Sequence, residues 1–97
     1  MSTNDTAAAS AVRTAEATHP PHVARRMHRA REIAPEVRVL DGPHGNRGFR
    51  SGRWRVRHDG RERHIRASLP ASMSRENRAA RIAMAAAFEI AAEEEEQ

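Results

Sequence analysis

Arginine carries most of the chemistry available to this sequence. All 17 basic residues are arginine, and eight of them fall between residues 47 and 66, where Asp59 and Glu62 are the only acids. A guanidinium group binds a phosphate, or the O6 and N7 atoms of guanine, through two parallel hydrogen bonds. The formal charge of this stretch, eight minus two or +6, therefore predicts a surface that attracts nucleic acid.

The rest of the chain does not share this excess of positive charge. Residues 1–46 hold six arginines and five acids, and residues 67–97 hold three arginines and six glutamates, which completes the net charge of +4. Solubility alone usually mixes charges of both signs, although a plain soluble surface remains the alternative. A genome rich in G and C would explain the absence of lysine equally well, so the placement of the arginines is more informative than their type.

The arginine-rich stretch has the pattern of a β-hairpin. Residues 53–57 alternate polar and apolar side chains, which is typical of a half-buried strand. Asp59-Gly60 follows and suits a type I′ turn, and residues 62–67 then form the returning strand. A two-residue loop pairs Trp54 with Ile65 and places both on one face with Val56. The opposite face then carries Arg53, Arg55, Arg57, Glu62, His64 and Arg66.

A helix and further strands are predicted before the hairpin. His22–Ala34 suits a short helix between two prolines. This helix either covers the core or brings its arginines to phosphates, and the sequence leaves both alternatives open. Glu36–Leu40 favours a strand, and Gly48–Arg50 is predicted as a separate short strand that ends at Ser51-Gly52.

Arg75–Glu93 is predicted as the longest helix, capped at its start by one of two serines. Its apolar arc is wider than one small sheet covers. The remainder, around Met84 and Phe88, is therefore expected to contact the N-terminal helix or a second copy of the chain. The acidic run Glu93–Glu96 stands where the helix dipole disfavours it, so this end is predicted to fray. The run either solvates the chain or competes with nucleic acid for the arginines.

Together these elements predict an α+β fold: a small antiparallel three-stranded sheet packed against a C-terminal α-helix, with a short N-terminal helix. We divide the chain into a disordered tail over residues 1–21, one small domain over 22–92 with its core in 46–92, and an acidic tail over 93–97. The sequence has no cysteine and no apolar run long enough to cross a bilayer. The default is a cytoplasmic protein with no membrane partner, associated with the nucleoid if it binds DNA.

The sequence offers little for catalysis or metal binding. It has no cysteine nucleophile, its serines lie in tails, turns or caps, and no pair of acids falls on neighbouring predicted elements. His19, His22 and His28 have the spacing of metal ligands, but no carboxylate or thiolate completes the set. Arg55 beside His64 resembles nuclease chemistry, although a histidine in a basic patch is more often a binding residue. We therefore predict a protein that is not an enzyme and that uses no cofactor or metal.

Three short motifs resemble those of a known family. They are Arg47-Gly48-Phe49-Arg50 for a first strand, Gly52-Arg53-Trp54 for the start of a second strand, and Arg78-Ala79-Ala80-Arg81 for an Ala-rich helix. Residues 46–92, about half of the chain, thereby resemble the ethylene-response-factor (Apetala-type) DNA-binding domain and its bacterial and phage relatives, and are similar to the arm-site-binding domain of tyrosine integrases. The resemblance implies that Trp54 packs against the helix and that Arg50 and Arg57 contact DNA. The chain departs from the family at Ile65–Leu69, where the family has Leu-Gly.

We predict from these observations a nucleic-acid-binding protein, as a DNA-binding transcriptional or recombination accessory factor. A three-stranded sheet placed in a groove presents its outward side chains to phosphates and base edges. DNA is the predicted partner, the sequence does not separate it from RNA, and a homodimer through the C-terminal helix is a further alternative. The competing class is a small phage- or mobile-element-encoded interaction module or inhibitor that binds an acidic protein. The residues predicted to bind nucleic acid are Arg47, Arg50, Arg53, Arg55, Arg57, His64 and Arg66.

Overall fold

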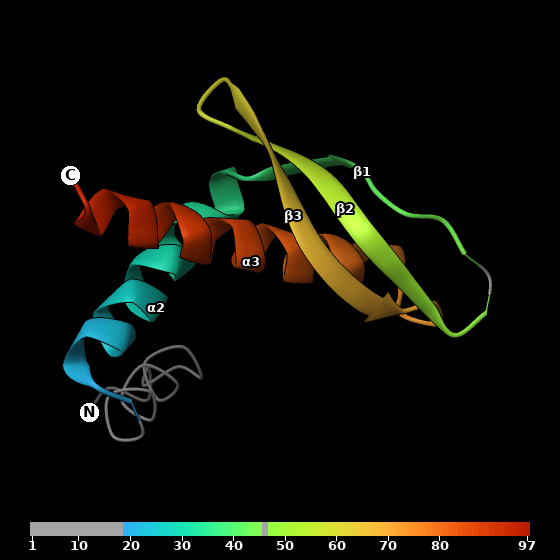
Figure 1. Cartoon of the computed structure of the whole chain (residues 1–97), viewed down its shortest axis with the longest axis horizontal. Helices are drawn as coiled ribbons and strands as arrows, with labels where there is room; N and C mark the ends of the chain where they lie inside the picture. Colours follow the sequence, from blue (N-terminus) through green and yellow to red (C-terminus); the bar gives the residue numbers. More distant parts are fainter. Residues whose placement is uncertain (1–18, 46) are drawn as a thin grey trace, which may run out of the picture.

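The computed structural model describes residues 19–45 and 47–97, so residues 1–18 of the predicted tail lie outside the described residues (Figure 1). Its three strands form one antiparallel sheet in the order β1-β2-β3, with a helix before the sheet and another after it. The predicted α+β fold class is confirmed. The elements are α2 (Pro21–Ile33), a 3-10 turn (Ala34–Glu36), β1 (Arg38–Asp41), β2 (Phe49–His58), β3 (Arg61–Pro70) and α3 (Arg75–Glu95).

The β2–β3 hairpin has the predicted register. Trp54 pairs with Ile65, and the ladder runs without a shift from Phe49 opposite Pro70 to the residues beside the turn. Asp59 and Gly60 both have positive φ, 52° and 73°, as a type I′ turn requires. The alternation of side chains on this hairpin therefore follows directly from the sequence.

The strand predicted over Gly48–Arg50 does not exist as a separate element. β2 continues through Ser51-Gly52, because these two residues pair with Ser68 and Ala67 and keep the ladder intact. The first strand of the sheet is instead β1, close to the predicted Glu36–Leu40. Residues that the family resemblance assigned to a first strand thus lie at the start of β2, and this changes which face Arg50 occupies.

The interior is divided into two clusters that share the partly buried Val37. Where the sheet lies on α3, the buried side chains are Trp54, Val56, Ile65, Leu69, Ile82 and Ala86. Where α2 lies along the C-terminal part of α3, they are Ala30, Ile33, Ala87, Ile90 and Ala91. Figure 1 shows the two helices side by side, beyond the area that the sheet covers. Trp54 is 5% exposed, which confirms its predicted burial against the C-terminal helix.

The wide apolar arc of α3 is covered within the chain except around Met84. Helix α2 packs on its C-terminal part, and Phe88 is partly buried against this contact, whereas Met84 stays 39% exposed. The N-terminal helix therefore contacts one of the two predicted residues. No helix of the described ranges is long and apolar enough to cross a membrane.

Helix α3 is capped at its start by Ser74, whose hydroxyl accepts a hydrogen bond from the backbone N–H of Asn77 at 3.2 Å. It ends at Glu95, so most of the acidic run belongs to the helix and does not fray from it. Three glutamates of the acidic run form ion pairs with arginines elsewhere in the chain: Glu95 with Arg26 at 2.7 Å, Glu94 with Arg29 at 2.9 Å, and Glu93 with Arg63 at 2.7 Å. The run connects α3 to α2 and to the hairpin.

Candidate nucleic-acid interface

One face of the sheet points away from α3, and we call it the outer face. Side chains alternate between the two faces of a strand, and Trp54 points toward α3. The residues on either side of Trp54, and every second residue beyond them, therefore point to the outer face. These residues are Arg38 and Asp41 of β1, Phe49, Ser51, Arg53, Arg55 and Arg57 of β2, and Glu62, His64, Arg66, Ser68 and Pro70 of β3. The outer face thus holds five arginines and two acids, and the two signs are not evenly distributed over it.

We call the end of the outer face near the Asp59-Gly60 turn the turn end. Most of its arginine charge is neutralised by acids. Arg55 donates to Asp41 at 3.2 Å and to Glu62 at 3.1 Å, and Arg57 donates to Glu62 at 2.9 Å. Hydrogen bonds from Arg57 and Arg55 lower the pKa of the Glu62 carboxyl, and the bonds to Asp41 and Glu62 raise the pKa of Arg55. These groups stay charged at neutral pH and satisfy one another.

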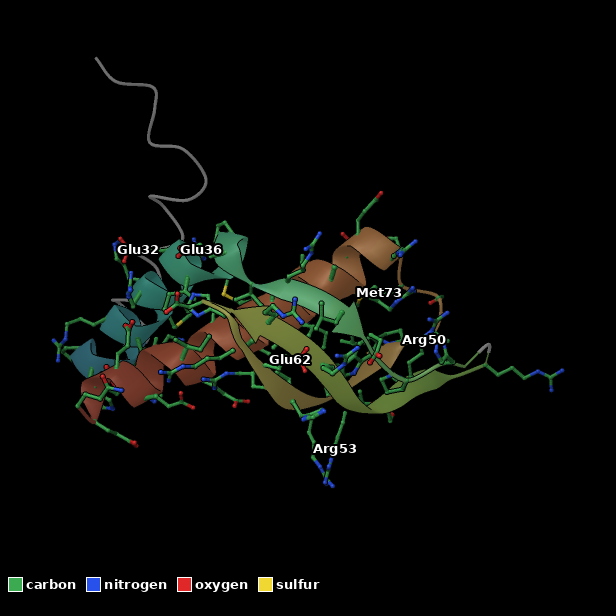
Figure 2. The ribbon with its side chains drawn as sticks, turned by 90° about the horizontal axis from the view of Figure 1, so that it is seen from above. Glu32, Glu36, Arg50, Arg53, Glu62 and Met73 are labelled. Atoms are coloured by element: carbon green, nitrogen blue, oxygen red, sulfur yellow. The ribbon has the colours of Figure 1, made fainter. Side chains whose placement is uncertain are left out.

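The other end of the outer face, here the open end, comprises Phe49–Arg53 of β2 and Arg66–Pro70 of β3. Arg53 pairs directly with Arg66 across the two strands, and both side chains are exposed. Neither makes an ion pair with any residue that the structure describes. Figure 2 shows Arg53 pointing away from the body of the protein. Arg38 and Arg61, near the other end of the sheet, also make no ion pair with a described residue. The open end differs in that two such arginines stand directly opposite each other.

An exposed aromatic ring lies on the same face as these arginines. Phe49 is 63% exposed and stands opposite Pro70. Between it and Arg53, the hydroxyls of Ser51 and Ser68 lie 2.5 Å apart and share a hydrogen bond. Sequence reasoning missed Phe49 because it ended a strand at Ser51-Gly52. Extending the alternation of residues 53–57 backward by two steps would have placed the ring on the outer face.

The predicted site residues do not all gather on this face. Arg53, Arg55, Arg57, His64 and Arg66 share it. Arg50, predicted together with them as a nucleic-acid contact, does not lie on this face, because β2 is continuous and Arg50 stands an even number of residues from Trp54. Figure 2 shows Arg50 on the side of the sheet where Met73 and the start of α3 lie. Arg47 is exposed and precedes β2, and Arg38, which was not predicted, joins the outer face opposite Arg57.

Helix α2 turns its small apolar residues toward α3, with Ala24, Ala30 and Ile33 buried. Its arginines Arg26 and Arg29 are held by glutamates of α3, and the guanidinium of Arg26 lies 5.6 Å from the centre of the Phe88 ring. Of the two alternatives for this helix, the structure shows the one in which it covers a core.

Within residues 19–45 and 47–97, no three histidines, aspartates or glutamates come close enough together to hold a metal ion. No family model, curated protein or solved structure matches this chain.

Proposed function

We propose that the protein binds nucleic acid through the open end of its outer face. The observation that carries the proposal is the pair of Arg53 and Arg66, which oppose each other on neighbouring strands without a described acidic partner. Like charges placed directly opposite each other destabilise a sheet. The pair should therefore lower the stability of the free protein. A polyanion bound along this face would compensate both charges.

Duplex DNA is the partner that the shape of the open end favours. β1 pairs only with residues 55–57 of β2, so the hairpin extends past it as a ribbon of two strands. The major groove of B-DNA is about 12 Å wide and admits a two-stranded ribbon. The resemblance of residues 46–92 to a sheet-based DNA-binding domain supports the same partner. We propose that the protein acts as a transcriptional or recombination accessory factor.

The exposed ring of Phe49 favours a second candidate, a single strand of DNA or RNA. Bases stack on exposed aromatic side chains, and each such contact is worth about 1–3 kcal/mol on alanine substitution. Duplex DNA presents stacked bases that the ring does not reach without distortion of the helix. Phe49→Ala therefore separates the two candidates, because it should weaken single-strand binding by about tenfold and duplex binding much less.

The proposal is tested by titrating the protein into labelled duplex DNA, single-stranded DNA and duplex RNA, with fluorescence anisotropy measured at several salt concentrations. The variant Arg53→Gln/Arg66→Gln should bind more weakly at low salt. Two lost phosphate contacts reduce the slope of log affinity against log salt by about 2. The matched control is Arg25→Gln/Arg31→Gln, which removes two exposed arginines of α2 that form no ion pair with a described residue.

Equal losses of affinity in the two double variants would show that nucleic acid is attracted by the overall charge and not bound at a defined site. If the unchanged protein binds none of the three nucleic acids at low salt, the proposal is rejected, and an acidic protein becomes the preferred partner. Loss of binding through unfolding is excluded by urea denaturation. Removing the opposed charges of Arg53 and Arg66 should leave the free energy of unfolding the same or raise it by about 0.2–1 kcal/mol.

A further inference from the structure

A second basic site lies on the opposite side of the sheet from the outer face. It is a hollow of about 390 Å³ between the β1–β2 loop, the start of β2 and the first turn of α3. We call it the loop pocket. Its polar and shape-determining lining residues are Gly42, Pro43 and His44 of the loop, Arg50 of β2, and Arg75 and Arg78 of α3.

The charges around the loop pocket are strongly unbalanced. Among the described residues, three arginines line it, and the one carboxylate in its lining is that of Asp41. This carboxylate accepts a hydrogen bond from Arg55 at 3.2 Å, on the other side of the strand. Three positive charges and one negative charge leave a formal excess of +2. A phosphomonoester carries a charge of about −1.5 to −2 at pH 7.

The donors of these arginines are only partly used. The Nε of Arg50 is buried and finds no hydrogen-bond acceptor among the described residues. A buried donor without an acceptor costs free energy, which an acceptor oxygen of a bound anion would recover. Arg78 donates from Nη1 to the backbone carbonyl of Met73, which fixes its guanidinium at the edge of the pocket. Arg75 makes no ion pair with a described residue.

The position of Arg75 and Arg78 in the first turn of α3 is a second, independent sign. The N-terminal end of a helix carries a partial positive charge, so cations placed there are unfavourable and anions are favourable. The first turn contains one acid, Glu76, which is exposed and does not line the pocket. A bound anion would interact favourably with both guanidinium groups and with the helix dipole.

The walls of the pocket are held in place by Trp54. Gly42 lies against the indole ring, and a Cβ atom at this position would be 2.0 Å from the ring carbon Cε3. The loop is thus packed directly on a buried side chain, so the pocket exists before any ligand arrives. Its volume falls in the range of about 300–1,000 Å³ typical of small-molecule sites.

We propose that the loop pocket binds a phosphate group, carried either by a free mononucleotide or by the end of a nucleic-acid strand. The three guanidinium groups supply paired N–H donors for its oxygens. The proposal does not depend on the outer face, because the two sites lie on opposite sides of the sheet and share no residue that contacts the ligand. The proposal gives a role to Arg50, which does not lie on the outer face.

The test uses the full chain and follows binding by calorimetry and by the NMR signal of the Trp54 indole N–H. The probes are inorganic phosphate, AMP with adenosine as its uncharged counterpart, and a single-stranded oligonucleotide with and without a 5′-phosphate. AMP should bind and adenosine should not. A preference for the 5′-phosphorylated oligonucleotide identifies a strand end as the source of the phosphate, and AMP binding without that preference identifies a free nucleotide. Either result supports the pocket.

Arg75→Gln and Arg50→Gln should each weaken AMP binding by about tenfold, as expected for the loss of a charge-assisted hydrogen bond. Arg81→Gln is the matched control, because Arg81 is exposed on the same helix and does not line the pocket. Arg75 is exposed, so its variant is expected to fold even if Arg50→Gln does not.

The proposal is overturned if phosphate, AMP and the phosphorylated strand all fail to bind at millimolar concentration. It is also overturned if Arg81→Gln weakens AMP binding as much as the pocket variants do. Arg53→Gln should leave AMP binding unchanged, which separates failure of this site from failure of the outer face.

Discussion

The contact between α2 and α3 uses arginine differently from the open end of the sheet and the loop pocket. Where α2 lies along α3, Arg26 and Arg29 each meet a glutamate of α3 within 3 Å. On the open end of the sheet and in the loop pocket, Arg53, Arg66 and Arg75 meet no described acid. The paired arginines Arg26 and Arg29 join α2 to α3, whereas the unpaired ones form no such link between elements. The contrast indicates where the protein has charge available for a partner.

The helical part of the molecule and its sheet part also differ in what fills their interiors. The cluster between α2 and α3 consists mainly of alanines with Ile33 and Ile90, so the two helices approach closely and little volume is enclosed. The cluster between the sheet and α3 is arranged around the ring of Trp54. Stability should therefore depend on one large side chain in the sheet part and on many small contacts in the helical part.

The largest expected effect comes from Trp54→Ala, which should lower the free energy of unfolding by about 3–5 kcal/mol. The ring is buried, its Nε1 donates to the carbonyl of Ala67 at 3.3 Å, and its removal leaves a cavity. Urea denaturation followed by circular dichroism measures the change. Phe88→Ala, at the partly exposed edge of the helical cluster, is the comparison and should cost clearly less. Equal losses of unfolding free energy in the two variants would show that the sheet part does not depend more strongly on one large side chain than the helical part does.

A smaller loss is expected for Gly42→Ala, which adds a methyl group where the loop touches Trp54. The new Cβ would overlap the ring, and the displacement of loop or ring should cost about 1–3 kcal/mol. Gly45→Ala in the same loop is the control, because its Cβ would lie 3.6 Å from the carbonyl oxygen of Phe49, an ordinary contact. If both variants unfold at the same urea concentration as the unchanged protein, the loop does not pack on the ring as described.

The smallest expected effect is a loss of stability at low pH, which tests the ion pairs of the acidic run. Hydrogen bonds from Arg63 and Arg29 lower the pKa values of Glu93 and Glu94 below those of the unfolded chain. This contribution to stability is present above the ordinary glutamate pKa of about 4.3 and is lost as the pH falls through the lowered values. It should be modest because the pairs are partly exposed. The urea midpoint measured from pH 7 to pH 2 shows it.

The variant Arg29→Gln/Arg63→Gln should make that pH profile flatter than the profile of the unchanged protein. Part of the slope should remain, because Arg57 and Arg55 lower the pKa of Glu62 in the same way on the outer face. An unchanged profile in the double variant would show that the acidic run does not stabilise the fold through these pairs.

Much of the hairpin could be predicted from sequence because its determinants are local. Alternation over residues 53–57 and the Asp59-Gly60 turn fix the register, and a one-residue shift would expose Trp54. The length of β2 could not be predicted in the same way. Ser51-Gly52 has the composition of a break, and only its pairing with residues 67–68 shows that the strand continues.

The parts that the sequence did not reveal depend on contacts between distant segments. Alternation puts Arg63 on the same side of the hairpin as Ile65, but its glutamate partner is 30 residues away on α3. The loop pocket combines residues from three separate elements, so no local spacing marks it. Propensity and periodicity describe single elements, whereas such sites arise from their packing.

The attachment of α2 to the far end of α3 has a kinetic consequence. Its ion pairs join residues 65 and 69 positions apart in the chain, whereas the hairpin joins immediate neighbours across a two-residue turn. Closing a long loop loses more chain entropy than closing a short one, and contacts between near neighbours in sequence form sooner. The hairpin should therefore order first, and α2 should be the last element to dock and the first to detach. Until it docks, Ala30 and Ile33 face water, and amide protons of α2 should exchange with solvent before those of β2 and β3.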